Sequence, residues 1–133
     1  MHPLPHPAHR LLIVDDEEAI LFAMTDYFSR SGYLVDCARS RGEAEDLLAS
    51  EAYSLVIADL RLDPADPRGG LALLLRARQS RGGTRGILLT AYGSTEVESE
   101  LLGMGGALLL SKPRPLAQVG EAVSRLLDGL PPT

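Results

Sequence analysis

Four acidic residues, Asp15, Asp16, Glu17 and Glu18, follow directly on the apolar run 11–14. Carboxylates this close repel one another unless a cation lies among them. Carboxylate oxygens are the ligands that a hard divalent cation such as Mg²⁺ prefers, and phosphate oxygens often complete a Mg²⁺ site. The acidic run therefore indicates a Mg²⁺ site that could also receive a phosphate group.

Three further side chains that could take part in such chemistry lie at or just after the ends of apolar runs. Asp59 ends "SLVIAD", Thr90 lies in "LLTAYGS", and Lys112 follows "ALLLS". A carboxylate next to a divalent cation can accept a phosphoryl group as an aspartyl phosphate. A hydroxyl and an ammonium group can hold the phosphoryl oxygens. Lys112 is the only lysine beside twelve arginines, and its compact charge suits a phosphate.

Each of these residues also has an ordinary structural explanation. Asp15 or Asp16 could cap the first helix. Asp59 could be a turn residue, and Thr90 could be an N-cap. Lys112 could be a solvated surface charge before a proline. A functional site explains the whole set better than these separate roles do, because carboxylates that come together without a compensating cation repel one another.

Five short apolar runs alternate with five segments of helical periodicity. The runs cover 10–15, 33–38, 54–59, 86–91 and 107–112. Apolar residues recur at three- and four-residue spacing in 20–28, 44–48, 71–78, 97–104 and 116–127. The alternation predicts an α/β fold, a doubly wound five-stranded parallel sheet with helices on both faces. Ligands of such sheets bind at the carboxyl ends of the strands, where the side chains named above fall.

The composition is that of one globular domain. The chain has 133 residues, of which 45% are hydrophobic, and its net charge of −5 argues against direct nucleic-acid binding. No apolar run approaches the roughly 18 to 20 residues that span a bilayer, and the N-terminus lacks the pattern of a signal peptide. We therefore expect a cytoplasmic protein without membrane contact. The single cysteine, Cys37, is expected to be a small core residue.

The two ends differ from the rest of the chain. Residues 1–8 are rich in proline and histidine and are expected to form a flexible leader. Residues 9–129 are expected to form the domain, and 130–133 a tail or the start of a linker. No further domain is seen after the fifth helical segment, so we expect either a stand-alone domain or a segment of a longer protein.

The motifs resemble the receiver domain of two-component response regulators. "VDDE", "VIADLRL", "LLTAYGS" and "SKP" occur in the family's order and spacing, over roughly residues 9–129. The resemblance implies the flavodoxin-like strand order 2-1-3-4-5. It also implies a phosphorelay, in which a sensor histidine kinase or a phosphotransfer protein donates a phosphoryl group and the receiver changes a protein-binding surface. The family further suggests a homodimer through the fourth helix, fifth strand and fifth helix.

The resemblance assigns a role to each matching position around the metal. Asp59 would be the phosphoacceptor and also a metal ligand. Asp16 would bind Mg²⁺ directly, and Asp15 would act mainly through a metal-bound water. The backbone carbonyl of Arg61 would be a further ligand.

The phosphoryl group would lie on the other side of the acceptor. The Thr90 hydroxyl, the Ala91 amide and the Lys112 ammonium would bind its oxygens. The bond between Lys112 and Pro113 would resemble the family's cis peptide. Self-phosphorylation from small phosphodonors and autodephosphorylation would follow, so the chain would be mainly a signalling switch.

The sequence departs from the family at several positions. Leu109 replaces the aromatic residue that often reports phosphorylation in receivers, three positions before the lysine. The loop after Asp59 is two or three residues longer than usual, and Asp63 and Asp66 add negative charge to it. Arg61 and Tyr92 occupy the two flanking positions that are expected to control water access and thus the dephosphorylation rate.

Three other functions are weaker. A receiver fold that no longer accepts phosphate would act only as an interaction module, but the complete acidic set argues against it. A Mg²⁺-dependent aspartyl phosphatase usually needs an alternating DxD pair, which "DDEE" and "ADLR" lack. A flavin or nucleotide binder would need a glycine- or Ser/Thr-rich phosphate loop after the first strand, where this chain has carboxylates.

Overall fold

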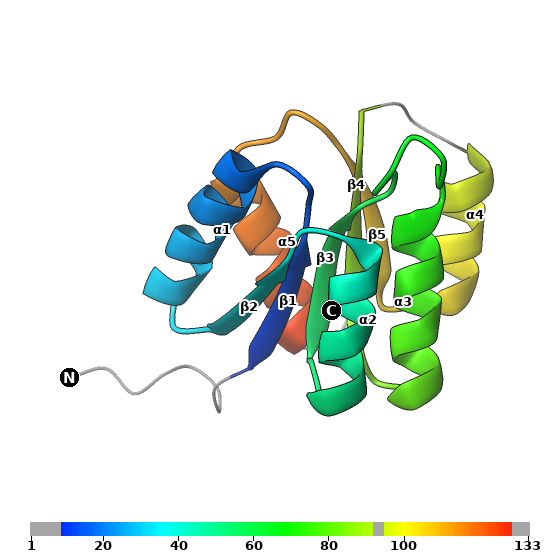
Figure 1. The fold of residues 1–133 in the computed structure, drawn as a ribbon. Helices are drawn as coiled ribbons and strands as arrows, with labels where there is room; N and C mark the ends of the chain where they lie inside the picture. The colour runs from blue at the N-terminus through cyan, green and yellow to red at the C-terminus, as the bar shows by residue number, and fades with distance from the viewer. Residues whose placement is uncertain (1–8, 92–94, 129–133) are drawn as a thin grey trace.

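A five-stranded parallel sheet with the strand order β2-β1-β3-β4-β5 organises the molecule (Figure 1). The computed structural model describes residues 9–91 and 95–128. The strands are β1 (Arg10–Val14), β2 (Leu34–Ala38), β3 (Leu55–Asp59), β4 (Arg85–Thr90) and β5 (Ala107–Ser111). The helices are α1 (Glu18–Arg30), α2 (Arg41–Ser50), α3 (Gly69–Ser80), α4 (Thr95–Met104) and α5 (Leu116–Asp128). The predicted fold class and strand order are confirmed.

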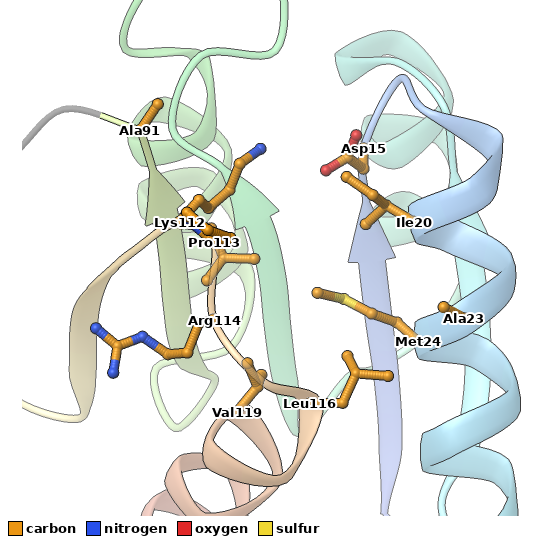
Figure 2. A pocket seen from close by; sticks show the side chains of 11 residues that line it. Asp15, Ile20, Ala23, Met24, Ala91, Lys112, Pro113, Arg114, Leu116 and Val119 are labelled. Carbon is orange, nitrogen blue, oxygen red and sulfur yellow. The ribbon is translucent and has the colours of Figure 1, made fainter.

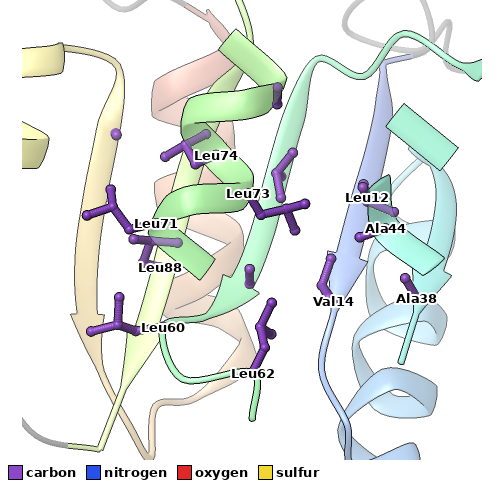
Figure 3. Packing of buried hydrophobic residues seen from close by; sticks show 14 of the residues in the cluster. Leu12, Val14, Ala38, Ala44, Leu60, Leu62, Leu71, Leu73, Leu74 and Leu88 are labelled. Carbon is purple, nitrogen blue, oxygen red and sulfur yellow. The ribbon is translucent and has the colours of Figure 1, made fainter. Parts of the chain in front are cut away.

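The sheet separates two apolar cores, because successive side chains of a strand point to opposite faces. In β1, Leu11 and Ile13 pack with α1 and α5, whereas Leu12 and Val14 face α2, α3 and α4. Figure 3 shows the second core, with Leu73 of α3 directed toward the sheet. The three inner strands, β1, β3 and β4, are nearly continuous apolar runs because they are covered on both faces.

The edge strand β2 is less well covered, and this corrects one expectation. Cys37 is exposed rather than a core residue, and its sulfur lies 3.4 Å from the Thr25 hydroxyl of α1. β2 is an edge strand that pairs only with β1, and its position at the edge of the sheet leaves Cys37 exposed beside α1. The other face of β2 carries Asp36, which accepts a 2.7 Å hydrogen bond from the Tyr53 hydroxyl.

The ends of the chain and part of the segment before α4 lie outside the described residues. The expected leader and tail fall there, as does Tyr92. Among the residues that the structure describes, no helix is long and apolar enough to cross a membrane.

Candidate functional site

The site lies at the carboxyl ends of the strands, beside the point where the strand order reverses. β1 lies between β2 and β3, so the segments that leave β1 and β3 turn to opposite faces of the sheet and open a crevice between them. Asp15 follows β1, Asp59 ends β3, Thr90 ends β4, and Lys112 follows β5. The fold therefore brings to one edge four side chains that the sequence spreads over almost a hundred residues.

Asp15 is the most constrained carboxylate of the site. Its side chain is only 2% exposed, and one of its oxygens accepts a 2.9 Å hydrogen bond from the Glu17 amide. The pKa of Asp15 is raised to about 6, chiefly by burial and to a smaller extent by the charges of Asp59 and Asp16, and the Glu17 amide and Lys112 offset only part of this rise. Asp15 is thus a buried carboxylate that lacks full compensation by a positive charge.

Three carboxylates form a compact group of oxygen donors. Asp15, Asp16 and Glu17 each place one oxygen within 4.8 Å of the others, and Asp16 and Glu17 are exposed. Glu17, which belongs to the acidic run but not to the set of metal ligands that the family resemblance implies, is the third member of this group. The signal for it was only its adjacency to the acidic pair. Neither aspartate caps α1, because the N-cap residue is Glu17 and it makes no side-chain cap bond.

Asp59 is held between the acidic group and a lysine. Its Oδ2 accepts a 2.7 Å hydrogen bond from the Lys112 ammonium, and its Oδ1 accepts a 3.2 Å bond from the Arg61 amide. Partial burial acts to lower the pKa of Lys112, but the hydrogen bond and charge of Asp59, together with Asp15 and Glu17, raise it overall. Lys112 therefore stays protonated at neutral pH and carries a fixed positive charge beside the Asp59 carboxylate.

Two cavities meet at Lys112 and Ala91. The polar cavity, of about 370 Å³, contains Asp59 and Thr90 and is lined by Leu60, Arg61, Pro67, Arg68, Ala91, Glu96, Val97 and Lys112. The second, of about 430 Å³, is mainly apolar and lies between α1 and the start of α5 (Figure 2). In that view Met24 and Leu116 face one another, and Asp15 and Lys112 lie on opposite sides of the opening.

The remaining predicted residues occupy the rim. The Arg61 side chain is exposed, and Ala91 is exposed at the end of β4. Leu109 is half-buried and lines a groove with Thr90, Thr95 and Arg114. The peptide bond between Lys112 and Pro113 is cis, which confirms that expectation.

Gly70 contributes to the site through its missing side chain, and the sequence reasoning gave it no role. A Cβ at this position would lie 2.3 Å from the backbone oxygen of Asp59 and 3.0 Å from the Cα of Leu60. The Gly70 amide donates a 2.9 Å hydrogen bond to the Leu60 carbonyl. The start of α3 therefore packs directly on the backbone that carries Asp59. The pair of glycines at 69–70 was the only sequence signal for this contact.

The long loop between β3 and α3 is tied to the rest of the molecule at both sides. Leu62 is buried, and the Asp63 side chain accepts a 2.8 Å bond from the Ala65 amide. Asp66 pairs with Arg41 of α2 at 2.9 Å. The loop is therefore anchored at Leu62 and Asp66, while its other residues between 61 and 68 are exposed.

The arrangement defines a doubly wound α/β protein with an acidic, lysine-bearing site at its switch point. Residues 11–124 match the response regulator receiver domain family. The chain belongs to the response regulator receiver domain family.

Relatives and solved structures agree with this assignment. The chain is 36% identical to the transcriptional regulatory protein PmrA of Pectobacterium parmentieri over 89% of its length, but it spans only 52% of that protein. It is 28% identical to sporulation initiation phosphotransferase F of Bacillus subtilis, of which it spans 93%. Among solved structures, a CheY-like receiver domain from Methanospirillum hungatei shares 31% identity with a TM-score of 0.82, over 92% of this chain and 96% of the other.

Proposed function

We propose that this receiver domain accepts a phosphoryl group on Asp59 and thereby switches a protein-binding surface. The observation that carries the proposal is the position of Asp59, which shares one polar cavity with Thr90 and Lys112. Lys112 is bonded to one oxygen of the carboxylate, and Asp15 is near enough for the charge of Asp59 to raise its pKa. A nucleophilic carboxylate thus lies between a cation and an acidic group.

The proposed reaction is a direct transfer. An oxygen of Asp59 forms a bond to phosphorus while the P–N bond of a phosphohistidine, or the P–O bond of an acyl phosphate, breaks. The leaving nitrogen or oxygen keeps the bonding electrons. Lys112 moves its hydrogen bond from the carboxylate to a phosphoryl oxygen, and the Thr90 hydroxyl and Ala91 amide donate to the other oxygens.

Mg²⁺ fits the acidic end of the site. Asp15, Asp16 and Glu17 offer hard oxygen donors close together, and a cation would stabilise the buried carboxylate of Asp15. We assign the ion to Asp15, Asp16, Asp59 and the Arg61 carbonyl, with Glu17 beside them. When bound, Mg²⁺ would supply positive charge against the oxygens of the transferring group.

The proposed partners follow from the family. The phosphoryl donor would be a sensor histidine kinase or a phosphotransfer protein in the cytoplasm. The surface of α4, β5 and α5 is proposed for homodimers, and its apolar part includes Leu102, which is 76% exposed.

Leu109 packs against the core beside α4 as an aliphatic residue and cannot make the hydrogen bond of an aromatic switch residue. Tyr92 and Arg61 are proposed to control water access.

An intact-mass measurement tests the proposal. The purified protein is incubated with Mg²⁺ and either acetyl phosphate or phosphoramidate, which carry P–O and P–N bonds. We expect a gain of one phosphoryl group, which a chelator abolishes. No gain with either donor would contradict the proposal and favour a receiver fold that acts only as an interaction module.

A further inference from the structure

A salt bridge connects the long β3–α3 loop to α4. Arg68, the last residue before α3, pairs with Glu100 on α4. The side chains are 49% and 47% exposed, so the pair is half in water. Such exposed pairs contribute only about 0.2–1 kcal/mol and exchange partners at low cost. The loop has a second and independent anchor through the pair of Arg41 and Asp66.

Arg68 also lines the polar cavity that contains Asp59. Lys112 and two residues of α4, Glu96 and Val97, line the same cavity. Arg68 therefore lies between two possible anionic partners, the carboxylate of Glu100 and a group bound at Asp59. A guanidinium presents several N–H donors in a plane, which suits a phosphoryl group well.

The two partners differ in charge once Asp59 carries a phosphoryl group. Glu100 has a single negative charge, whereas a phosphoryl group on Asp59 carries about −1.5 to −2 charges and three acceptor oxygens in place of the single charge of the carboxylate. Within the polar cavity the competition then favours the phosphoryl group, because the opposing pair is exposed and weak.

We propose that Arg68 is an additional phosphoryl-binding residue that leaves Glu100 when Asp59 is phosphorylated. This inference rests on the proposed phosphorylation of Asp59. The exchange removes the salt bridge between the β3–α3 loop and α4, so α4 is released at the same step that holds the phosphoryl group. Phosphorylation of Asp59 can thereby alter the α4 surface without any change at Leu109.

Steady-state phosphorylation by acetyl phosphate tests the exchange through variants with opposite expected effects. Glu100→Gln frees Arg68 and should lower the half-saturating donor concentration by about two- to fivefold, the equivalent of an exposed pair. Arg68→Gln removes the phosphoryl contact and should raise it by about tenfold. Arg68→Lys should recover part of this loss. Arg41→Gln is the matched control, because it unties the same loop without lining the cavity, and it should leave the value unchanged.

Amide hydrogen exchange of residues 95–104 supplies a readout for α4. Phosphorylation should increase exchange there in the wild type, and Glu100→Gln should already show the increase without phosphorylation.

Equal half-saturating donor concentrations for the wild type and Arg68→Gln would overturn the role of Arg68. Changes of this concentration in the same direction in Arg68→Gln and Glu100→Gln would overturn it too. A wild type that takes up no phosphoryl group would overturn the proposed function as well, so the two failures are distinguishable.

Discussion

The Lys112 ammonium lies 2.7 Å from an oxygen of Asp59, although the two residues are 53 positions apart in the sequence. β4 lies between β3 and β5, so the lysine side chain reaches across the end of one strand to the acceptor. Both side chains are mostly buried, with 22% and 16% exposed. This hydrogen bond fixes the position of the Asp59 carboxylate. It also places an ammonium group where it can donate to a phosphoryl oxygen after transfer.

Replacement of Lys112 should slow phosphorylation more than it changes the fold. We expect Lys112→Ala to lower the rate with acetyl phosphate on the order of a hundredfold, because one charged donor to the transferring group is lost. Lys112→Arg keeps the charge in a bulkier, planar form and should retain part of the rate. Intact mass recorded over time measures both variants. A rate within about twofold of the wild type in Lys112→Ala would show that the lysine does not contact the phosphoryl group.

Asp15→Asn should stabilise the metal-free protein at neutral pH. The folded-state pKa of Asp15 is raised from 3.8 to about 6, so its ionisation costs the folded state free energy. This cost is absent below pH 4, grows as the pH rises, and is complete above the folded pKa. At pH 7.5 we expect the free energy of unfolding to increase by about 1–3 kcal/mol, and near pH 4 we expect almost no difference. Urea unfolding in chelator at the two pH values measures the effect.

Two comparisons control this prediction. Asp16→Asn changes an exposed carboxylate of the same group and should shift the free energy of unfolding by less than about 0.5 kcal/mol. Mg²⁺ should stabilise the wild type and have little effect on Asp15→Asn. A loss of stability in Asp15→Asn at pH 7.5 would mean that the ionised carboxylate is compensated within the protein.

Gly70→Ala should damage both stability and the site. The new Cβ would lie 2.3 Å from the Asp59 carbonyl oxygen, and because its neighbours are backbone atoms, a backbone segment would have to shift. We expect a loss of about 2–3 kcal/mol in the free energy of unfolding and slower phosphorylation. Gly103→Ala is the matched control, because nothing lies within 4 Å of that Cβ and α4 gains a better helix former. Equal stability of both variants would contradict the close packing of α3 on Asp59.

The sequence predicted the sheet well because its signal is local. The β1, β3 and β4 runs are apolar and short, and each precedes a polar residue at the switch edge. Asp15 and Asp59 were therefore assigned to the site from strand ends alone. Cys37 was placed wrongly because the sequence does not show that β2 lies at the edge of the sheet, where its side chains are only partly covered.

The contacts of the long loop were beyond sequence reasoning. The pair of Arg41 and Asp66 joins residues 25 positions apart, and that of Arg68 and Glu100 joins residues 32 apart. Charge pairing over such separations depends on how the helices pack, and many other pairings of the charged residues are equally compatible with the sequence. The acidic run contained Glu17, but the turn after β1 decides which of the four adjacent carboxylates lie together, so the sequence did not show that Glu17 would join Asp15 and Asp16.

The most direct test of the account locates the phosphoryl group. Wild type, Asp59→Asn and Asp63→Asn are treated with Mg²⁺ and acetyl phosphate, reduced with borohydride to trap the acyl phosphate, and mapped by peptide mass spectrometry. We expect modification at Asp59 in the wild type and in Asp63→Asn, and none in Asp59→Asn. Modification of Asp59→Asn to the wild-type extent, or modification of the wild type at another carboxylate, would contradict Asp59 as the acceptor.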